Sequence, residues 1–454
     1  MESSGAGQTV KVAIIGAGWA GLAAAVKATE AGHNVTIFEA TQTLGGRARA
    51  LPGSPAQVLP DGSPTQLDNG QHILIGAYTE TLALMRLVGI SPEAALLDLP
   101  MTLRFPDGLG LKFANWPTPL DALGGILQAR GWSLGDKGSL LRAALGWKLH
   151  GFSCADTLSV TELCRHLTPR IKAELIEPLC VSALNTPPGQ ASAQVFLRIM
   201  RDALFGVQGG SRLLLPRVDL SALFPDAAAS WVLARGGQLR LGQRVASLQT
   251  QGAQWGVQEE LFDTVILATP ASQATQVLTQ YAHEAPQGTM ANVADWIHVA
   301  QSLSHEAIAT VYAWAPRARL PQAMLALRSS VHHLAQFVFD RGQLGGPVGL
   351  LAFVVSAAHG ERATLQARVL AQAREQLGMD LQPVQTVVEK RATFACTPGL
   401  QRPPIAIAPG LLACGDYVAG PYPATLEGAV RSGCAAVALL GAHANRAMSV
   451  KIQP

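Results

Sequence analysis

Three glycines near the start of the chain have the spacing of a phosphate-binding turn. Gly16, Gly18 and Gly21 follow the pattern G-x-G-x-x-G, and an acidic residue, Glu39, comes 18 residues after Gly21. The first glycine permits a tight turn, the second lets a pyrophosphate approach the backbone, and the third lets a helix pack closely on a strand. A carboxylate at Glu39 can accept hydrogen bonds from a ribose diol. These residues predict that the chain binds a dinucleotide.

The segments around these residues have the order needed to bring them together. Residues 12–15 predict a buried parallel strand, residues 19–31 a helix, and residues 35–38 a second strand that ends at Glu39. Free N–H groups at the helix start, at the positive end of its dipole, would hold the phosphates. Glycines alone also serve ordinary turns, but this order indicates a complete βαβ unit. The predicted cofactor-binding residues therefore include the neighbours of the glycines and of the acid: Ala17, Trp19, Ala20 and Ala40.

The composition of the 454-residue chain indicates extensive apolar surface. Charged residues make up only 14%, whereas about a quarter is usual, and the mean hydropathy is +0.22. This balance predicts either a deep apolar pocket or contact with a membrane. The formal net charge is +3, and no basic cluster interleaves with aromatic residues, so nucleic acid is excluded as an expected partner.

The cysteines and the lengths of the apolar runs indicate where in the cell the protein is expected. None of the six cysteines forms a CxxC pair or clusters with histidines at metal-ligand spacing, so we expect a reduced, cytoplasmic protein without a structural metal. Residues 1–9 are polar and lack the apolar core of a signal peptide. No run of 18 uncharged apolar residues is present, so any membrane contact is expected to be peripheral, on the inner face of the cell membrane.

A second glycine pair follows the βαβ unit directly. Gly45 and Gly46 precede Arg47, and this order can bring backbone and a guanidinium close to an anion. Its place just after the second strand and Glu39 favours that role over an ordinary surface loop. Together with the first motif, these residues resemble the flavoprotein superfamily of amine oxidases, phytoene desaturases and protoporphyrinogen oxidases. The resemblance implies that the dinucleotide is FAD rather than NAD.

The same resemblance implies where the middle of the chain meets FAD. Segment 67–78 would pass beside the isoalloxazine ring, which brings Gly70, Gln71 and His72 to the cofactor. A strand that begins after Gly236-Gly237 and ends near Val245 would clasp the adenine through backbone atoms.

The last motif would complete the cofactor site from the far end of the chain. A strand leads to Gly415 and Asp416, and the acid suits a hydrogen bond to the ribityl chain or to a hydroxyl linked to a cofactor phosphate. A helix beginning near Thr425 and Leu426 would direct its N–H groups at the flavin O2, where negative charge grows on reduction. No cysteine stands at a plausible attachment point in this loop, so we expect noncovalent FAD.

The remaining patterns predict an α/β protein: a Rossmann-type FAD-binding domain with an interleaved α+β substrate domain and helical segments. We expect a cofactor domain in three parts, residues 10–98, 213–279 and 405–447, and a substrate domain in two parts, residues 99–212 and 280–404. The expected elements are short strands within 99–113, helical segments within 116–152 broken at Gly131 and Gly138, helix within 157–204 after a cap at Ser159, strands at 307–314, 334–340 and 348–355, and a helix at 362–377. Residues 1–9 and 280–301 are expected to be loops.

More specific segments narrow the family. Residues 67–72, 178–196, 213–219 and 415–429 resemble the squalene-associated, FAD-dependent hydroxysqualene dehydroxylases of bacterial hopanoid biosynthesis. The resemblance covers nearly the whole chain. It implies reductive removal of an allylic hydroxyl from hydroxysqualene to give squalene, with hydride from reduced FAD reaching an allylic cation. The electron donor is left unidentified.

Several residues are candidates for this chemistry. His72 is the first candidate for the proton donor that assists loss of water, and Asp68 is a second candidate for the reacting centre. The alternatives are that Asp68 caps a turn and that His72 is a packing histidine. Tyr422, Tyr417 or a tryptophan could stabilise the cation through its ring.

Other functions stay open at this point. A polyene or carotenoid desaturase would use the same fold oxidatively, an amine oxidase would need a polar cage for a cationic substrate, and a non-catalytic FAD-binding module would need no second domain of this size. The apolar helices within 116–152 carry Trp132 and Trp147 with intermittent basic residues, which suits either a membrane surface or an ordinary core. His332 and His333 are expected to be surface or packed residues.

Overall fold

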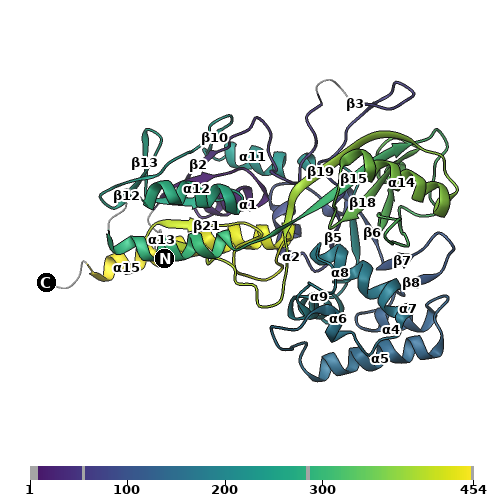
Figure 1. The fold of residues 1–454 in the computed structure, drawn as a ribbon. Coiled ribbons are helices and arrows are strands. Elements are labelled where there is room, and N and C mark those ends of the chain that lie inside the picture. The colour runs from purple at the N-terminus through teal and green to yellow at the C-terminus, as the bar shows by residue number, and fades with distance from the viewer. Residues whose placement is uncertain (1–8, 54–56, 283–286, 451–454) are drawn as a thin grey trace, which may run out of the picture.

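A six-stranded, mostly parallel sheet forms one end of the molecule (Figure 1). The computed structural model describes residues 9–53, 57–282 and 287–450. The strands in spatial order are β10 (Gln238–Arg240), β2 (Asn34–Phe38), β1 (Lys11–Ile15), β14 (Thr264–Leu267), β21 (Leu411–Ala413) and β20 (Ala406–Ala408). Three distant stretches of chain therefore meet in one sheet, and the expected α/β fold class is confirmed.

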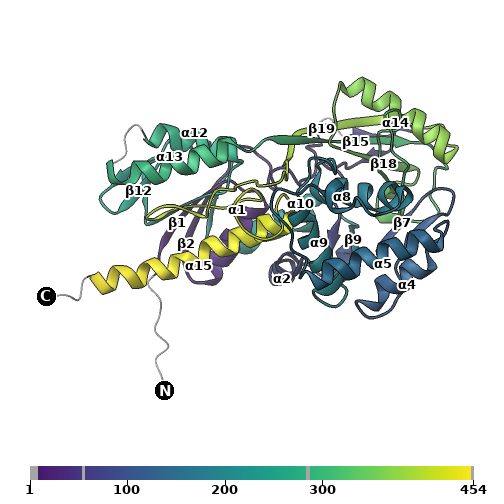
Figure 2. The same cartoon turned by 60° about the horizontal axis from the view of Figure 1, so that its bottom comes forward.

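Helices cover both faces of this sheet because its central strand is apolar on both. Val12 and Ile14 of β1 pack toward α1 (Trp19–Glu30) and α15 (Leu426–Val450), whereas Ala13 and Ile15 belong to the core that includes α12 (Ala271–Ala282). Figure 2 shows α1 and α15 on one side of the sheet and α12 on the other. Buried strands of a parallel sheet read as continuous apolar runs for this reason.

A five-stranded antiparallel sheet lies at the other end and carries α14 (Arg362–Leu377) (Figure 1). Its strands in spatial order are β16 (Met324–Ala326), β17 (Phe337–Asp340), β18 (Leu350–Ser356), β15 (His305–Trp314) and β19 (Gln382–Phe394). The expected strands and the expected helix at 362–377 are confirmed. The long strand β19 was not among the expected elements.

Helices beneath the five-stranded sheet, in the view of Figure 1, build a third region. They are α4 (Leu120–Gln128), α5 (Leu134–Leu149), α6 (Val160–Leu163), α7 (Pro169–Ile171), the π-helical turn η1 (Lys172–Ile176), α8 (Glu177–Leu184) and α9 (Ala193–Phe205). The cap expected at Ser159 is confirmed, because its hydroxyl accepts from the Glu162 N–H while the Glu162 carboxylate accepts from the Ser159 N–H.

Small β elements and short helices connect these regions. A three-stranded sheet joins β5 (Leu74–Ile75), β9 (Leu213–Pro216) and β6 (Leu96–Leu99), and two hairpins are formed by β3 (Gln57–Val58) with β4 (Pro64–Thr65) and by β7 (Thr102–Arg104) with β8 (Gly110–Lys112). The others are α2 (Thr79–Leu87), α3 (Pro92–Ala95), α10 (Leu220–Leu223), α11 (Pro225–Leu233), β11 (Gln249–Gln251), β12 (Gln254–Val257) and β13 (Glu260–Phe262). Among the described helices, none is both long and apolar enough to cross a bilayer.

Three local expectations are wrong. Gly138 does not break the chain but lies inside α5, because a capping box between Ser133 and Asp136 starts that helix and an open helical glycine costs only about 1 kcal/mol. The strand expected to end near Val245 ends at Arg240, and the chain then turns so that the Gln243 N–H donates to the Glu39 carbonyl.

The third error concerns residues 280–301, which are not a loop. Residues 283–286 lie outside the described residues, but Gln287–Gln301 forms helix α13. Its buried residues Val293, Trp296 and Ala300 recur at helical spacing, and the Trp296 indole N–H donates to the Pro404 carbonyl. The helix therefore packs beside β20 on the six-stranded sheet.

Candidate active site

One large cavity runs from the carboxyl ends of the parallel strands into the helical region. Its volume is about 1050 Å³, and its lining includes Gly16 at one end and Phe152 of the helical region at the other. Crevices at the carboxyl ends of parallel strands are the usual ligand sites of such sheets. The two ends differ in chemistry, so we describe them separately as the cradle, lined by residues 15–49, 243–245 and 415–429, and the apolar arm, lined by α4, α5, η1, α8 and α9.

The cradle places bare backbone where a phosphate could approach. Gly16 has a φ of +112°, and a Cβ there would lie 2.7 Å from the Ala268 carbonyl oxygen. Helix α1 has no side-chain cap at its N-terminus, so its first N–H groups face the cavity beside Gly18. Gly46 stands opposite, with its Cα 3.9 Å from where a Gly18 Cβ would be. This geometry fits a pyrophosphate between two glycine turns.

Glu39 is fixed at the end of β2. One carboxylate oxygen accepts from the Ala17 N–H at 2.8 Å, and the other accepts from the N–H and the hydroxyl of Thr41 at 2.9 and 2.8 Å. Ionised carboxylates offer about four acceptor positions, so one stays free for a sugar hydroxyl. Val245 lines the cavity in the same part of the cradle, although no strand holds it.

An ion pair joins the two ends of the sequence inside the cradle. The Arg47 guanidinium lies 2.5 Å from an Asp416 carboxylate oxygen, and it also donates to the Ala392 carbonyl of β19 at 2.6 Å. Burial disfavours the charge on Arg47, but the charge of Asp416 and its hydrogen bond outweigh this and raise the pKa of Arg47. The guanidinium therefore stays charged at the wall of the cavity.

The loop 69–72 forms the junction between the cradle and the apolar arm. The Asn69 side chain donates to the Arg47 carbonyl at 2.9 Å and to the Glu389 carboxylate at 3.2 Å. His72 Nδ1 lies 3.1 Å from the Gly70 carbonyl oxygen, and because a carbonyl only accepts, Nδ1 carries the proton there. Burial lowers the pKa of His72, so the ring is mainly neutral at pH 7 and its Nε2 is an acceptor.

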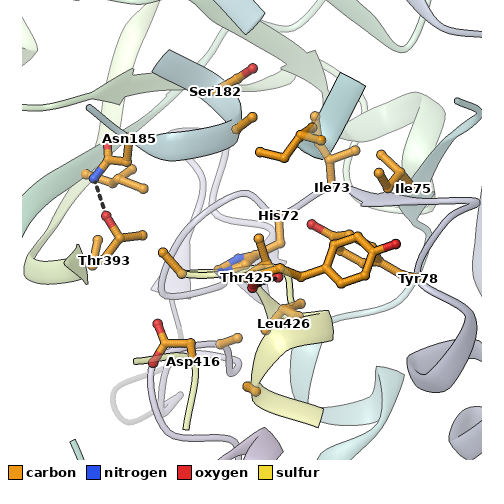
Figure 3. Close-up of a pocket in the computed structure, with 18 of the residues that line it drawn as sticks. His72, Ile73, Ile75, Tyr78, Ser182, Asn185, Thr393, Asp416, Thr425 and Leu426 are labelled. Atoms are coloured by element: carbon orange, nitrogen blue, oxygen red, sulfur yellow. Dashed lines mark hydrogen bonds between the residues drawn. The ribbon is translucent and has the colours of Figure 1, made fainter. Parts of the chain in front are cut away.

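Figure 3 shows how these groups surround the junction. His72 lies in the middle of the labelled side chains, with Asp416 and Leu426 below it and Ile73 and Ile75 above it. All five line the cavity.

Asp68 does not reach the cavity, so its candidacy for the reacting centre is wrong. It is 2% exposed; one carboxylate oxygen accepts from the Leu220 N–H at 2.9 Å, and the other lies 3.5 Å from the Arg341 guanidinium. Burial raises the pKa of Asp68 to about 6 despite Arg341. Arg341 also donates to the Gln71 side chain at 3.1 Å. The buried pair thus supports the junction loop from behind.

Two tyrosines approach each other next to the start of α15. The rings of Tyr78 and Tyr422 meet edge to face with centroids 5.9 Å apart, and both line the cavity. Burial raises the pKa of Tyr422 to about 12, so its phenol stays protonated. Tyr422 has a φ of 56°, a left-handed conformation that costs a non-glycine residue free energy and that often marks functional sites.

Glu427 has a structural role in the same region, at the start of α15. It is fully buried and accepts from the N–H groups of Glu80 and Thr81 and from Arg431 at 2.6 Å. These contacts tie α15 to α2 and hold Thr425 and Leu426 at the cavity wall.

The apolar arm is built from side chains of several helices rather than from a motif. Its lining includes Phe113, Ile126, Leu140, Leu141, Leu145, Trp147, Phe152, Leu175, Ile176, Leu179, Met200, Leu204 and Phe205. In this described lining no aspartate or glutamate is present, and Lys148 is the charged residue. A long apolar molecule could therefore extend from the junction into the arm.

Sequence reasoning missed several polar residues of the lining, among them Asn185, Glu389 and Thr393. Asn185, in a left-handed conformation at the end of α8, donates to the Thr393 hydroxyl at 3.0 Å and accepts from the Ala357 N–H at 2.6 Å (Figure 3). Glu389 and Thr393 both come from β19. The only local signal was the break after α8, because these contacts join segments about two hundred residues apart.

The structure brings most of the sequence-predicted site residues to this one cavity. Those that line it are Gly16, Gly18, Trp19, Ala20, Glu39, Ala40, Gly46, Arg47, Gly70, Gln71, His72, Val245, Gly415, Asp416, Tyr422, Thr425 and Leu426. Ala17 and Gly21 are not in the lining. Ala17 holds Glu39, and a Cβ on Gly21 would lie 2.0 Å from the Gly16 carbonyl oxygen, so Gly21 is where α1 and β1 approach closely.

The cradle gives a test of whether a dinucleotide fits. The backbone at Gly16, Gly18 and Gly46 leaves room for a pyrophosphate, and Glu39 keeps one acceptor position for a sugar hydroxyl. Tyr417 lines the cavity beside Asp416, but its hydroxyl, which has no partner among the described residues, is not exposed to the cavity. The residues present fit a bound dinucleotide.

Comparisons with known proteins support a flavin cofactor. Residues 19–440 match the family described as flavin containing amine oxidoreductase. The chain is 28% identical to a hydroxysqualene dehydroxylase of Rhodopseudomonas palustris, over 93% of this chain and 96% of that protein. It is 29% identical to a hydroxysqualene dehydroxylase of Zymomonas mobilis, over 95% and 99% respectively. The fold is similar to that of cyclohexylamine oxidase from Brevibacterium oxydans, with a TM-score of 0.67 at 15% identity over 96% of this chain and all of that one.

Proposed function

The chain belongs to the flavin containing amine oxidoreductase family, and from that premise we propose that it removes the allylic hydroxyl of hydroxysqualene reductively to give squalene. The coarser part, a flavin-dependent oxidoreductase related to enzymes of isoprenoid metabolism, follows from the relatives. The observation that carries the specific reaction is the single cavity that joins the cradle to a long arm free of carboxylates.

The flavin in this proposal is noncovalently bound FAD. Backbone at Gly16, Gly18 and Gly46 would hold its pyrophosphate, Glu39 its ribose, and Asp416 its ribityl chain. None of the six cysteines, all of them free, is in the described cavity lining, which favours noncovalent binding. When bound and reduced, FAD supplies a hydride at the junction.

The apolar arm would place the substrate so that its hydroxyl-bearing carbon lies at the junction. Burying the hydrocarbon chain contributes roughly 25 cal/mol per Å² of apolar surface, and excluding water protects an allylic cation from capture. In the balanced reaction the C–O bond breaks as a proton joins the hydroxyl, water leaves, and the hydride forms a C–H bond. An external two-electron donor must reduce the flavin again.

His72 and Tyr422 are the two residues that we propose for the proton and the cation. Protonated His72 would donate to the departing hydroxyl, and neutral His72 would accept a hydrogen bond from it through Nε2. Tyr422 presents a phenol that stays protonated over the neutral range, and its ring can face a cation. The two roles differ in their dependence on pH.

That difference can be measured. The lowered pKa of His72 means that its protonated form grows as pH falls below about 6.5, so turnover limited by His72 should rise toward low pH. Substituting His72→Gln should flatten this profile, whereas Tyr422→Leu, which removes the ring, should leave its shape unchanged and lower its height. A profile that His72→Gln leaves unaltered would remove His72 as the donor.

We place the reaction in the cytoplasm, at the inner face of the cell membrane. The free cysteines support a reducing compartment, and a hydrocarbon substrate of this length partitions into lipid. Squalene made in this way would serve bacterial hopanoid synthesis.

The deciding experiment is anaerobic incubation of the purified flavoprotein with hydroxysqualene and a chemical reductant. Squalene formed in proportion to enzyme supports the proposal, and enzyme with oxidised flavin and no reductant is the control. No squalene, together with flavin reduction by a polyene, would show a desaturase instead. Flavin reduction by an alkyl amine would show an amine oxidase, although the arm offers a cationic amine no carboxylate.

A further inference from the structure

Exposed leucines gather on the outer faces of α4 and α5. On α4, Leu120, Leu123 and Leu127 are exposed, at a spacing that places them on one side of the helix. On α5, Leu134 is 88% exposed and Leu149 is 76% exposed. On an adjacent side of α4, Ile126 is buried against the cavity. A surface helix that is apolar on its outer face needs a partner for that face.

The concentration of these residues is specific to one region. Of the large apolar side chains that are exposed among the described residues, those of this region are Trp116, Leu120, Leu123, Leu127, Leu134, Leu145, Leu149, Phe205 and Val207. The others, such as Leu233, Val331 and Val348, lie singly elsewhere along the chain. Single exposed apolar residues are normal, whereas a group of this size is not.

The exposed charges carried by residues 108–155, which include α4 and α5, are basic, whereas Asp156 directly after them is exposed and acidic. Residues 108–155 contain five cations, Lys112, Arg130, Lys137, Arg142 and Lys148. The acidic residues of this stretch, Asp121 and Asp136, are both buried. Apolar side chains surrounded by lysine and arginine are the pattern of proteins that lie on an anionic bilayer.

The same helices form the wall of the apolar arm. Leu120, Leu123, Leu145 and Phe205 are exposed and also line the cavity, so the arm reaches the surface between α4, α5 and α9. Figure 2 shows α4 and α5 at the outer edge of the molecule, far from α1 and α15. The surface and the mouth of the arm are therefore continuous.

We propose that the outer faces of α4 and α5, with Trp116, Phe205 and Val207, are a docking surface for an anionic lipid bilayer, and that the apolar arm opens into that bilayer. The exposed leucines enter the acyl boundary, and the basic residues contact lipid headgroups. This inference rests on the proposed function for one point, the identity of the molecule that enters the apolar arm. An apolar substrate would then pass from lipid to the junction without crossing water.

A second copy of this chain is a poorer occupant of the surface. A twofold contact brings the same patch of each subunit together, which would set Arg130, Arg142 and Lys148 against the same cations of the partner. Like charges in such a contact cost free energy. An anionic bilayer satisfies both the apolar and the basic residues.

Vesicle flotation of the flavin-loaded protein tests the surface without any substrate. Wild type should float with vesicles of phosphatidylcholine and phosphatidylglycerol, more weakly with phosphatidylcholine alone, and less as salt is raised. A triple variant, Leu127→Ser, Leu134→Ser and Leu149→Ser, should lower the partition coefficient roughly tenfold or more. None of these three residues lines the cavity.

A matched triple variant controls for loss of apolar surface in general. Leu233→Ser, Val331→Ser and Val348→Ser removes exposed apolar side chains outside the surface and should bind vesicles as wild type does. Flavin content and melting temperature show whether each variant is folded. Equal binding of both triple variants, or no binding of wild type, would overturn the proposal. A wild-type dimer that the first triple variant converts to a monomer would assign the surface to a second copy.

Turnover separates this inference from the proposed function. With substrate in detergent micelles, the first triple variant should match wild type, whereas with substrate in vesicles it should be slower by about the factor lost in binding. Vesicle binding through this surface without squalene formation would defeat the proposed reaction and leave the docking surface standing. Squalene formation without vesicle binding would do the reverse.

Discussion

The two ends of the cavity are built from different kinds of structure. The cradle consists mainly of backbone, with no room for a side chain at Gly16 or Gly21, and of a few charged side chains with fixed partners. The apolar arm consists mainly of side chains from five helical elements. Another apolar residue of similar size could replace each of them. The cradle therefore selects its ligand by the positions of its polar groups, whereas the apolar arm selects a ligand by the length and low polarity of that ligand. The cradle should therefore tolerate substitution much less than the arm.

The sharpest test of this contrast compares two glycines. A Cβ at Gly21 would lie 2.0 Å from the Gly16 carbonyl oxygen, and neither backbone can move without separating α1 from β1. Gly21→Ala should cost about 4 kcal/mol or more of stability and abolish flavin retention. Gly138→Ala in α5, where a Cβ meets nothing within 4 Å, should stabilise by about 0.5–1 kcal/mol and keep the flavin. Melting temperature and flavin absorbance measure the two effects. Similar values for the two variants would contradict the expected difference in tolerance between the cradle and the arm.

The next largest effect is expected at the ion pair of the cradle. Arg47→Gln leaves Asp416, which is 7% exposed, without its charged partner and removes the contact with β19. Because the Arg47 side chain is 36% exposed and that of Asp416 only 9%, we expect the flavin to lose about 2 kcal/mol of binding free energy, which is roughly 30-fold weaker binding. Titration of apoprotein with FAD measures it.

The control for Arg47 is an ion pair with similar geometry and no burial. Arg374→Gln breaks the pair with Asp380 at 2.5 Å on the surface and should change flavin affinity and stability by less than about 1 kcal/mol. If Arg47→Gln behaves like Arg374→Gln, the cradle does not depend on this contact.

Asp68 lies behind the junction of the two ends and should give a pH signature. Its pKa of about 6 in the folded protein exceeds the reference value of 3.8, so its contribution to stability is full below about 3.8 and is lost as pH rises through 6. Relative to Asp68→Asn, wild type should therefore lose about 2 kcal/mol between pH 4.5 and 7. Melting temperatures of both proteins across this range give the difference in stability. A difference that does not change with pH would show that the pKa of Asp68 is not raised.

The same contrast explains how much the sequence revealed. The βαβ unit and the helix at 362–377 were predictable, because a local period or a glycine pattern determines them. The pairing of Arg47 with Asp416 and of Asn185 with Thr393 was not, since each joins residues more than two hundred positions apart through the fold. The low charged fraction predicted a deep apolar pocket or membrane contact, but it could not identify the residues that line the apolar arm.

The errors have the same origin. Gly138 was misread because a strong cap at Ser133 outweighs one glycine in an exposed helix. Asp68 was misplaced because its carboxylate turns toward Arg341, whereas the neighbouring loop faces the cavity. Only α13 carried a local signal that was overlooked, the helical spacing of Val293, Trp296 and Ala300.

The smallest expected effect lies in the arm and separates lining from packing. Ile126→Val removes one methylene from the cavity wall, and Ile407→Val removes one from β20, where Ile407 is also buried but does not line the cavity. Both should cost about 1 kcal/mol of stability. Only Ile126→Val should raise KM for the long substrate, by roughly two- to fivefold, with flavin affinity unchanged, because one methylene contributes about 0.8 kcal/mol to apolar contact. Equal KM values for both variants would mean that the substrate does not occupy the arm. The assignment of the flavin to the cradle and of the substrate to the arm would then be wrong.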